Sequence, residues 1–135
     1  MGRFPTAAHL ASWAGLCPGN TESAGKRLSG RTRKGNPWLR TGLVEAAQAA
    51  ARTKGTSLAA QYRRLAARRG TRKAAVAVAH RILVIAYHLL RDGTVFTDLG
   101  ADFYDQRHRD RVDRRLVRRL EALGHRVTLT PATAA

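Results

Sequence analysis

The chain has 135 residues, of which 25 are lysine or arginine and 9 are aspartate or glutamate, so its formal net charge is +16. That length predicts one domain, or a fragment of a larger protein, with a single modest core. A balance this basic favours a polyanionic partner, most often nucleic acid, with an arginine- and alanine-rich coding bias as the alternative. The single cysteine, Cys17, excludes an intramolecular disulfide and a multi-cysteine zinc site, and we interpret it as a packed side chain.

Helix start signals and apolar periodicity predict an all-α fold. Thr6 is a good N-cap for the first helix, Asn36 followed by proline starts the second, and Thr56 or Ser57 caps the third. Thr71 is the expected cap of the longest helix. The predicted helices, about five in number, lie near residues 7–16, 37–52, 57–69, 72–92 and 102–123.

The helix predicted near 72–92 has apolar residues around much of its circumference, which indicates that it is the central helix. His80, Arg81 and His88 interrupt its apolar run, so a buried core helix fits better than a membrane span. The N-terminal residues lack the apolar region of a signal peptide. We therefore expect a cytoplasmic protein that has no membrane partner.

The helix predicted near 102–123 is dense in arginine and carries a narrow apolar seam. Residues 125–130 alternate weakly, as a short edge strand would. We expect residues 1–124 to form one domain and residues 125–135 to form a flexible tail. The seam consists of Val112, Leu116, Leu120 and Leu123.

Residues 15–40 are rich in glycine, hydroxyl and basic side chains, and they lack sustained apolar periodicity until their last few positions. They are predicted to form a long basic loop between the first two helices, and a loop of this length inside a domain is usually functional or disordered. Glycine allows backbone amides to approach a ligand, and cations beside such amides suit phosphate. The candidate nucleic-acid contacts are Lys26, Arg27, Arg31, Arg33, Lys34, Asn36 and Arg40.

Ser23 lies in the middle of this loop. A serine can attack a phosphodiester if a base removes its proton and cations stabilise the pentacoordinate phosphorus, but the sequence identifies no base. By itself Ser23 is therefore best interpreted as an ordinary loop hydroxyl. The five histidines are scattered and no pair of carboxylates has metal-site character, so no metal site is predicted. Trp38 and Tyr62 are candidates for stacking on bases, although core packing is favoured for both.

A series of short motifs runs through nearly the whole chain, and the ordered series is more specific than any one motif. With these motifs the sequence resembles the C-terminal domain of the IS one-ten family of insertion-sequence transposases, which includes the IS one-sixteen and IS nine-oh-two branches. The motifs are FPT at 4–6, ASWAGLCPG at 11–19, ESAGK at 22–26, KGN at 34–36, LR at 39–40, LVEAA at 43–47 and KAAVAVA at 73–79.

The resemblance implies a DNA recombinase built from two parts. An N-terminal RuvC-like domain with a DEDD acidic set binds divalent metal such as magnesium, and a C-terminal domain carries a serine that forms a covalent link to DNA. A structured guide RNA, called a bridge RNA, pairs donor and target DNA. The serine matches Ser23 here, while the glycine that usually follows it is replaced by Ala24, with Gly25 next.

The resemblance also implies a cellular location and further partners for the protein. As a bacterial transposase it is expected in the cytoplasm with the nucleoid, and self-association or docking on a full-length transposase is expected. The motifs begin close to Met1 and no DEDD set is recognised, so we interpret the chain as a truncated or separately encoded half that cannot recombine DNA alone.

Two other functions stay open. The chain could be a non-catalytic basic helical protein that binds DNA or RNA, including a decayed transposase remnant. It could also be a helical module that docks on another protein through the seam of Leu116 and Leu120.

Overall fold

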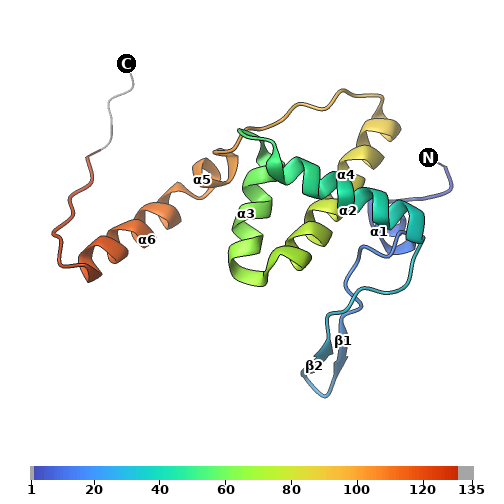
Figure 1. The fold of residues 1–135 in the computed structure, drawn as a ribbon, viewed down its shortest axis with the longest axis horizontal. Coiled ribbons are helices and arrows are strands. Elements are labelled where there is room, and N and C mark those ends of the chain that lie inside the picture. The colour runs from blue at the N-terminus through green and yellow to red at the C-terminus, as the bar shows by residue number, and fades with distance from the viewer. Residues whose placement is uncertain (1, 131–135) are drawn as a thin grey trace. The chain divides into compact units, whose positions relative to one another are not determined.

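The computed structural model describes residues 2–130, except for the side chain of Arg27, and confirms the all-α class. The chain divides into two compact units, Met1–Ala101 and Asp102–Ala135, and each is described by itself. The elements are α1 (Ala7–Trp13), β1 (Thr21–Ser23), β2 (Lys26–Ser29), α2 (Pro37–Arg52), α3 (Ser57–Arg69), α4 (Thr71–Asp92), α5 (Phe103–Arg107) and α6 (Arg109–Ala122) (Figure 1).

Three of the predicted caps are confirmed and one is wrong. The Thr6 hydroxyl accepts a hydrogen bond from the His9 amide, the side-chain Oδ1 of Asn36 accepts one from the Leu39 amide, and Thr56 rather than Ser57 caps α3. Thr71 does not cap α4, because the helix already includes it and Gly70 occupies the cap position without a side-chain bond.

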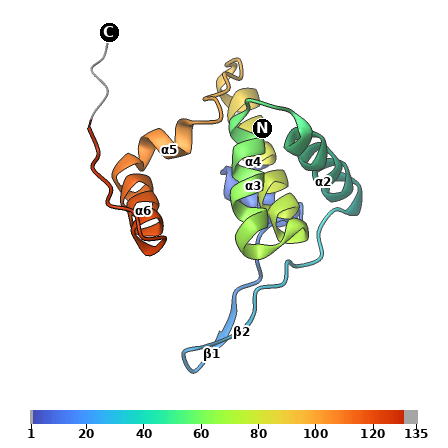
Figure 2. The same ribbon diagram turned by 60° about the vertical axis from the view of Figure 1, so that its left-hand side comes forward.

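The helix α4 is central to the first unit, as predicted. It contacts α1, α2 and α3, and the views in Figures 1 and 2 agree that these helices surround it. Most of the buried side chains are alanines, such as Ala47 on α2 and Ala79 on α4, so the helix axes approach closely. Within α2, Val44 packs against the core while Ala46 is exposed.

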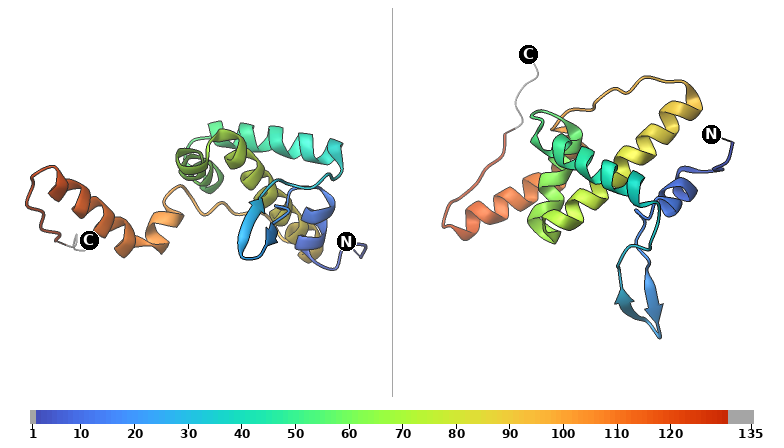
Figure 3. Two further views of the ribbon diagram at one scale, coloured as in Figure 1. Left: turned by 90° about the horizontal axis from the view of Figure 1, so that it is seen from below. Right: turned by 45° about the vertical axis from the view of Figure 1, so that its right-hand side comes forward.

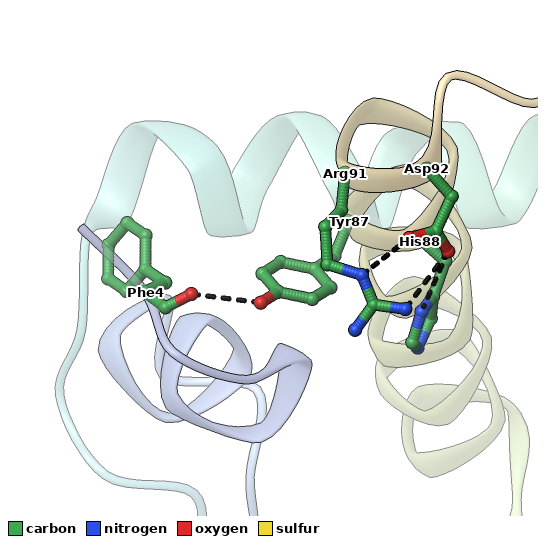
Figure 4. Close-up of polar contacts among 5 residues, drawn as sticks. All are labelled: Phe4, Tyr87, His88, Arg91 and Asp92. Carbon is green, nitrogen blue, oxygen red and sulfur yellow. Dashed lines mark hydrogen bonds and ion pairs between the residues drawn. The ribbon is translucent and has the colours of Figure 1, made fainter. Parts of the chain in front are cut away.

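Tyr87, near the C-terminal end of α4, ties the N-terminal segment to this core. Its buried hydroxyl donates a hydrogen bond of 2.9 Å to the Phe4 carbonyl oxygen (Figure 4). The Arg91 guanidinium lies 5.7 Å from the centre of the Tyr87 ring and forms an ion pair with Asp92 on the surface. The ion pair is exposed and contributes little, whereas the buried hydrogen bond contributes about 1 kcal/mol.

The segment that follows α4 is held by Asp98. The carboxylate accepts hydrogen bonds from the Ser57 amide at 2.9 Å and from the Ser57 hydroxyl at 3.2 Å, at the first residue of α3. These bonds, first that from the Ser57 amide, hold the pKa of Asp98 below its usual range. Ser57 is only 2% exposed, so Asp98 satisfies the amide and the hydroxyl of a buried residue.

Within the described part of the chain, α4 is the helix long and apolar enough to cross a membrane by length and composition. This is weak evidence for a span, because the core helix of a soluble protein has the same composition. Three helices pack on α4, so we interpret it as a core helix.

The second unit differs from the single helix predicted near 102–123. His108 has φ −126° and ψ 32°, which interrupts the helix and separates α5 from α6. The edge strand expected at 125–130 is wrong, since those described residues form no strand. Residues 131–135 of the predicted tail lie outside the described residues, and the predicted domain limit at residue 124 stays a prediction.

Candidate serine site and nucleic-acid interface

The segment between α1 and α2, residues 15–36, is called the arm here. It was predicted as a loop, but its outer part is an antiparallel hairpin of β1 and β2. Figures 1 and 3 show the hairpin projecting away from the helices. Its two strands contact each other rather than any helix. The described side chains of the hairpin are therefore exposed to solvent, whereas Leu16 at the base of the arm is buried.

The tip of the arm is a two-residue turn. Ala24 has φ +48° and Gly25 has φ +74°, and positive φ at both central positions is the type I′ pattern that suits a hairpin. Glycine adopts this backbone freely, but alanine there costs about 1 kcal/mol. The strain lies directly beside the candidate nucleophile Ser23.

The turn places Ser23 and Lys26 opposite each other. They are register partners in the hairpin, and directly opposite residues project from the same face with Cβ atoms about 4.5–5.5 Å apart. Both are exposed. Glu22 precedes Ser23, so alternation directs it to the other face. A cation and a hydroxyl thus share one face of the tip.

The base of the arm is fixed by a close backbone contact between two glycines. A Cβ on Gly15 would lie 2.8 Å from the Gly35 nitrogen, and a Cβ on Gly35 would lie 2.5 Å from the Ala14 carbonyl carbon. Farther out, the Gly19 amide donates to the Arg31 carbonyl oxygen at 2.9 Å. Only glycine fits at these two positions, where the outgoing and returning segments of the arm leave the core.

The predicted contacts do not gather at one point. Arg31, Arg33 and Lys34 are exposed on the returning side of the arm, toward its base rather than beside Ser23. Arg40 on α2 donates to the Thr32 hydroxyl at 2.9 Å and so supports the arm. The side-chain Oδ1 of Asn36 is engaged in the α2 cap, while Arg27 lies in β2 with its side chain outside the described atoms.

The proton acceptor that Ser23 would need is not supplied by the arm. Residues 15–36 contain no histidine, and their single acid is Glu22. No cluster of three or more metal-ligating side chains occurs within residues 2–130. Cys17 is partly buried against the core, and its burial raises the pKa of the thiol, so it is a poor nucleophile.

Two features escaped the sequence analysis. The hairpin had a weak signal, because Ala24-Gly25 separates two short runs that end in Ser23 and begin at Lys26. Trp38 was expected in the core but is 86% exposed, whereas Tyr62 packs against the core as predicted. Pattern alone does not orient a residue in the first turn of a helix.

In the second unit, an open pocket with a volume of about 300 Å³ lies where α5 meets α6. Its lining is mainly arginine, including Arg107, Arg111 and Arg114. No residue of α5 or α6 is buried, and Leu116 and Leu120 of the predicted seam are largely exposed. This unit presents both cations and an uncovered apolar seam.

Comparison with known proteins addresses the family. Residues 1–63, which include α1, the whole arm and α2, match the model of the Transposase IS116/IS110/IS902 family. The chain is 35% identical over 95 residues to the insertion element IS110 uncharacterized 43.6 kDa protein of Streptomyces coelicolor. That alignment covers 69% of this chain and 23% of the relative, so the chain matches about a quarter of the relative's length. No solved structure matches. The chain belongs to the IS116/IS110/IS902 family of transposases.

Proposed function

We propose that this chain is the serine-bearing, nucleic-acid-binding part of an insertion-sequence recombinase, and that Ser23 attacks DNA. The observation that supports this is the placement of Ser23 at the exposed tip of the arm, with Lys26 opposite it. A narrow projecting element can bring its hydroxyl against a phosphate of the DNA backbone. The family match covers the whole arm.

In the proposed step, the Ser23 Oγ forms a bond to phosphorus while one ester bond to a deoxyribose oxygen breaks. The hydroxyl proton passes to solvent, and the departing sugar oxygen takes up a proton. The Lys26 ammonium contacts a non-bridging oxygen and stabilises the charge that develops on it. Arg31, Arg33 and Lys34 bind neighbouring phosphates and hold the strand.

Divalent metal, such as magnesium, would be held by a DEDD domain rather than by this chain. The described residues fit that division of labour, because they offer a hydroxyl and one cation at the tip but no cluster of metal-ligating side chains. A structured guide RNA and a second transposase copy are the further partners in this proposal. The exposed arginines of α6 are available to the RNA.

The nucleophile is tested by a covalent adduct in cells that carry the element. The chain is recovered under denaturing conditions, and DNA-linked peptides are identified by mass spectrometry. We expect an adduct on Ser23 that disappears in Ser23→Ala, while DNA binding is almost unchanged. Ser29→Ala, which removes a neighbouring hydroxyl in the same hairpin, is the matched control and should retain the adduct.

Lys26 is tested in the same assay. Lys26→Gln should lower adduct formation about 100-fold, the usual effect of removing one transition-state donor, and Lys26→Arg should restore part of it. An adduct that persists in Ser23→Ala would exclude this nucleophile. An unchanged yield in Lys26→Gln would remove Lys26 from the step.

A second candidate is non-catalytic binding of DNA or RNA. It is favoured by the absence of a histidine from the arm and by cations spread over the arm and α6. A pure binder would be indifferent to Ser23→Ala in every assay, including transposition of the element.

A further inference from the structure

We infer that Trp38 forms a stacking platform for an unpaired nucleobase, next to the arm. The inference rests on the nucleic-acid binding proposed above, but it does not depend on chemistry at Ser23. Trp38 lies in the first turn of α2, two residues after the Asn36 cap, and its side chain is 86% exposed.

The exposure of Trp38 is unusual for its residue type. Indole has one of the largest apolar surfaces among side chains, and tryptophan is normally buried to a high degree. The other tryptophan, Trp13, is 50% exposed and its ring lies 5.5 Å from that of Phe4. Trp38 has no aromatic contact of this kind among the ring pairs of the described residues.

The surface beside Trp38 is open. Residues three and four positions along a helix lie on the same face, and here they are Thr41 and Gly42. Both are exposed, and a Cβ built on Gly42 would meet nothing within 4 Å. No bulky side chain of this face therefore covers the indole ring, and a planar base has room to lie on it.

The charge around Trp38 indicates which kind of planar ligand would bind. Exposed Arg31, Arg33 and Lys34 precede it, and they can neutralise phosphates on either side of a stacked base. Glu45 is the acid of α2 and lies two turns along the helix. Base stacking on an aromatic ring beside a cationic groove is the general mode by which proteins bind single strands. In a duplex the bases are already stacked on each other, so the platform selects unpaired nucleotides.

The chain itself allows a direct measurement, because it has two tryptophans. In a Trp13→Phe variant, Trp38 is the sole tryptophan, and its fluorescence reports stacking. We would titrate this variant with single-stranded oligothymidylate, with a blunt duplex of equal phosphate content and with inorganic polyphosphate, which has no bases. Strong quenching is expected with the single strand and little with the other two.

Affinity provides the second readout. Trp38→Ala should weaken binding of the single strand about 10- to 100-fold, the range measured for loss of one aromatic stacking residue, and should leave duplex binding unchanged. Trp38→Phe should retain most of the affinity. Lys34→Ala is the matched control, since loss of a phosphate contact should weaken single-strand and duplex binding alike.

Two outcomes would overturn the inference. One is single-strand affinity that is unchanged in Trp38→Ala, and another is equal quenching by polyphosphate. These titrations measure binding and need no bond between Ser23 and DNA. A failure of the adduct experiment therefore bears on Ser23, and a failure here bears on Trp38.

Discussion

The helical core, α1 to α4, and the arm use glycine and alanine in opposite ways. In the core, alanines such as Ala47 and Ala79 are buried and let helices approach. In the arm, Ala24 lies at the exposed tip with positive φ, while Gly15 and Gly35 sit at the base where two backbones touch. The core is stabilised by the burial of many small apolar side chains, whereas the conformation of the arm depends on a few backbone positions. The arm therefore presents charged and hydroxyl groups without a core of its own.

This difference predicts that the largest loss of stability comes from adding one Cβ atom at the base of the arm. Gly35→Ala should destabilise the protein by about 3 kcal/mol or displace the arm, because the added Cβ overlaps the backbone of Ala14 and Gly15. Urea denaturation measures the free energy of unfolding. Gly42→Ala is the matched control in an open helical position, and it should stabilise by up to about 1 kcal/mol. Equal effects of the two changes would show that the two backbones do not touch at the base.

A smaller effect is expected where Asp98 holds the core. Asp98→Ala removes the acceptor for the buried Ser57 amide, which should cost about 1 kcal/mol, the lower end for a cap because the carboxylate is exposed to water. The lowered pKa of Asp98 means that the unfolded chain binds this proton more readily. Its contribution to stability is thus present above the unfolded value of about 3.9 and is lost as the pH falls through the lower folded value.

Urea denaturation at neutral pH and near pH 3 tests this dependence. The loss of stability on acidification should be smaller in Asp98→Ala than in the wild type. Asp92→Ala, which removes an exposed carboxylate paired with Arg91, is the control and should change stability little at neutral pH. If the two variants have the same stability at neutral pH, the Asp98 bonds to Ser57 do not stabilise the fold.

The smallest effect should be local to the arm. Ala24→Gly relieves a residue with φ +48° and should stabilise the hairpin by about 0.5–1 kcal/mol without changing global unfolding. Amide hydrogen exchange of Thr21 to Ser29 should slow, while exchange in α4 stays the same. Slower exchange throughout α4 would indicate that the arm and the core unfold as one unit.

Local residue chemistry determined much of this fold. Asn36 before proline, Thr6 and the glycines after the helices set where helices begin and end, because capping involves neighbours in sequence. Apolar residues on most sides of the helix predicted at 72–92 indicated that it is the central one, because helical periodicity is also local in sequence. His108 was not recognised as a break, since its backbone angles have no clear sequence signature.

The motifs around Ser23 also identified the family from the sequence itself, because they are local and ordered. Only the tertiary structure placed Lys26 opposite Ser23, since pairing across a turn depends on the register of two strands. It also joined Asp98 to Ser57, forty-one residues apart, and exposed Trp38. Such contacts depend on how elements pack, and the residue pattern within one segment does not show which face meets which neighbour.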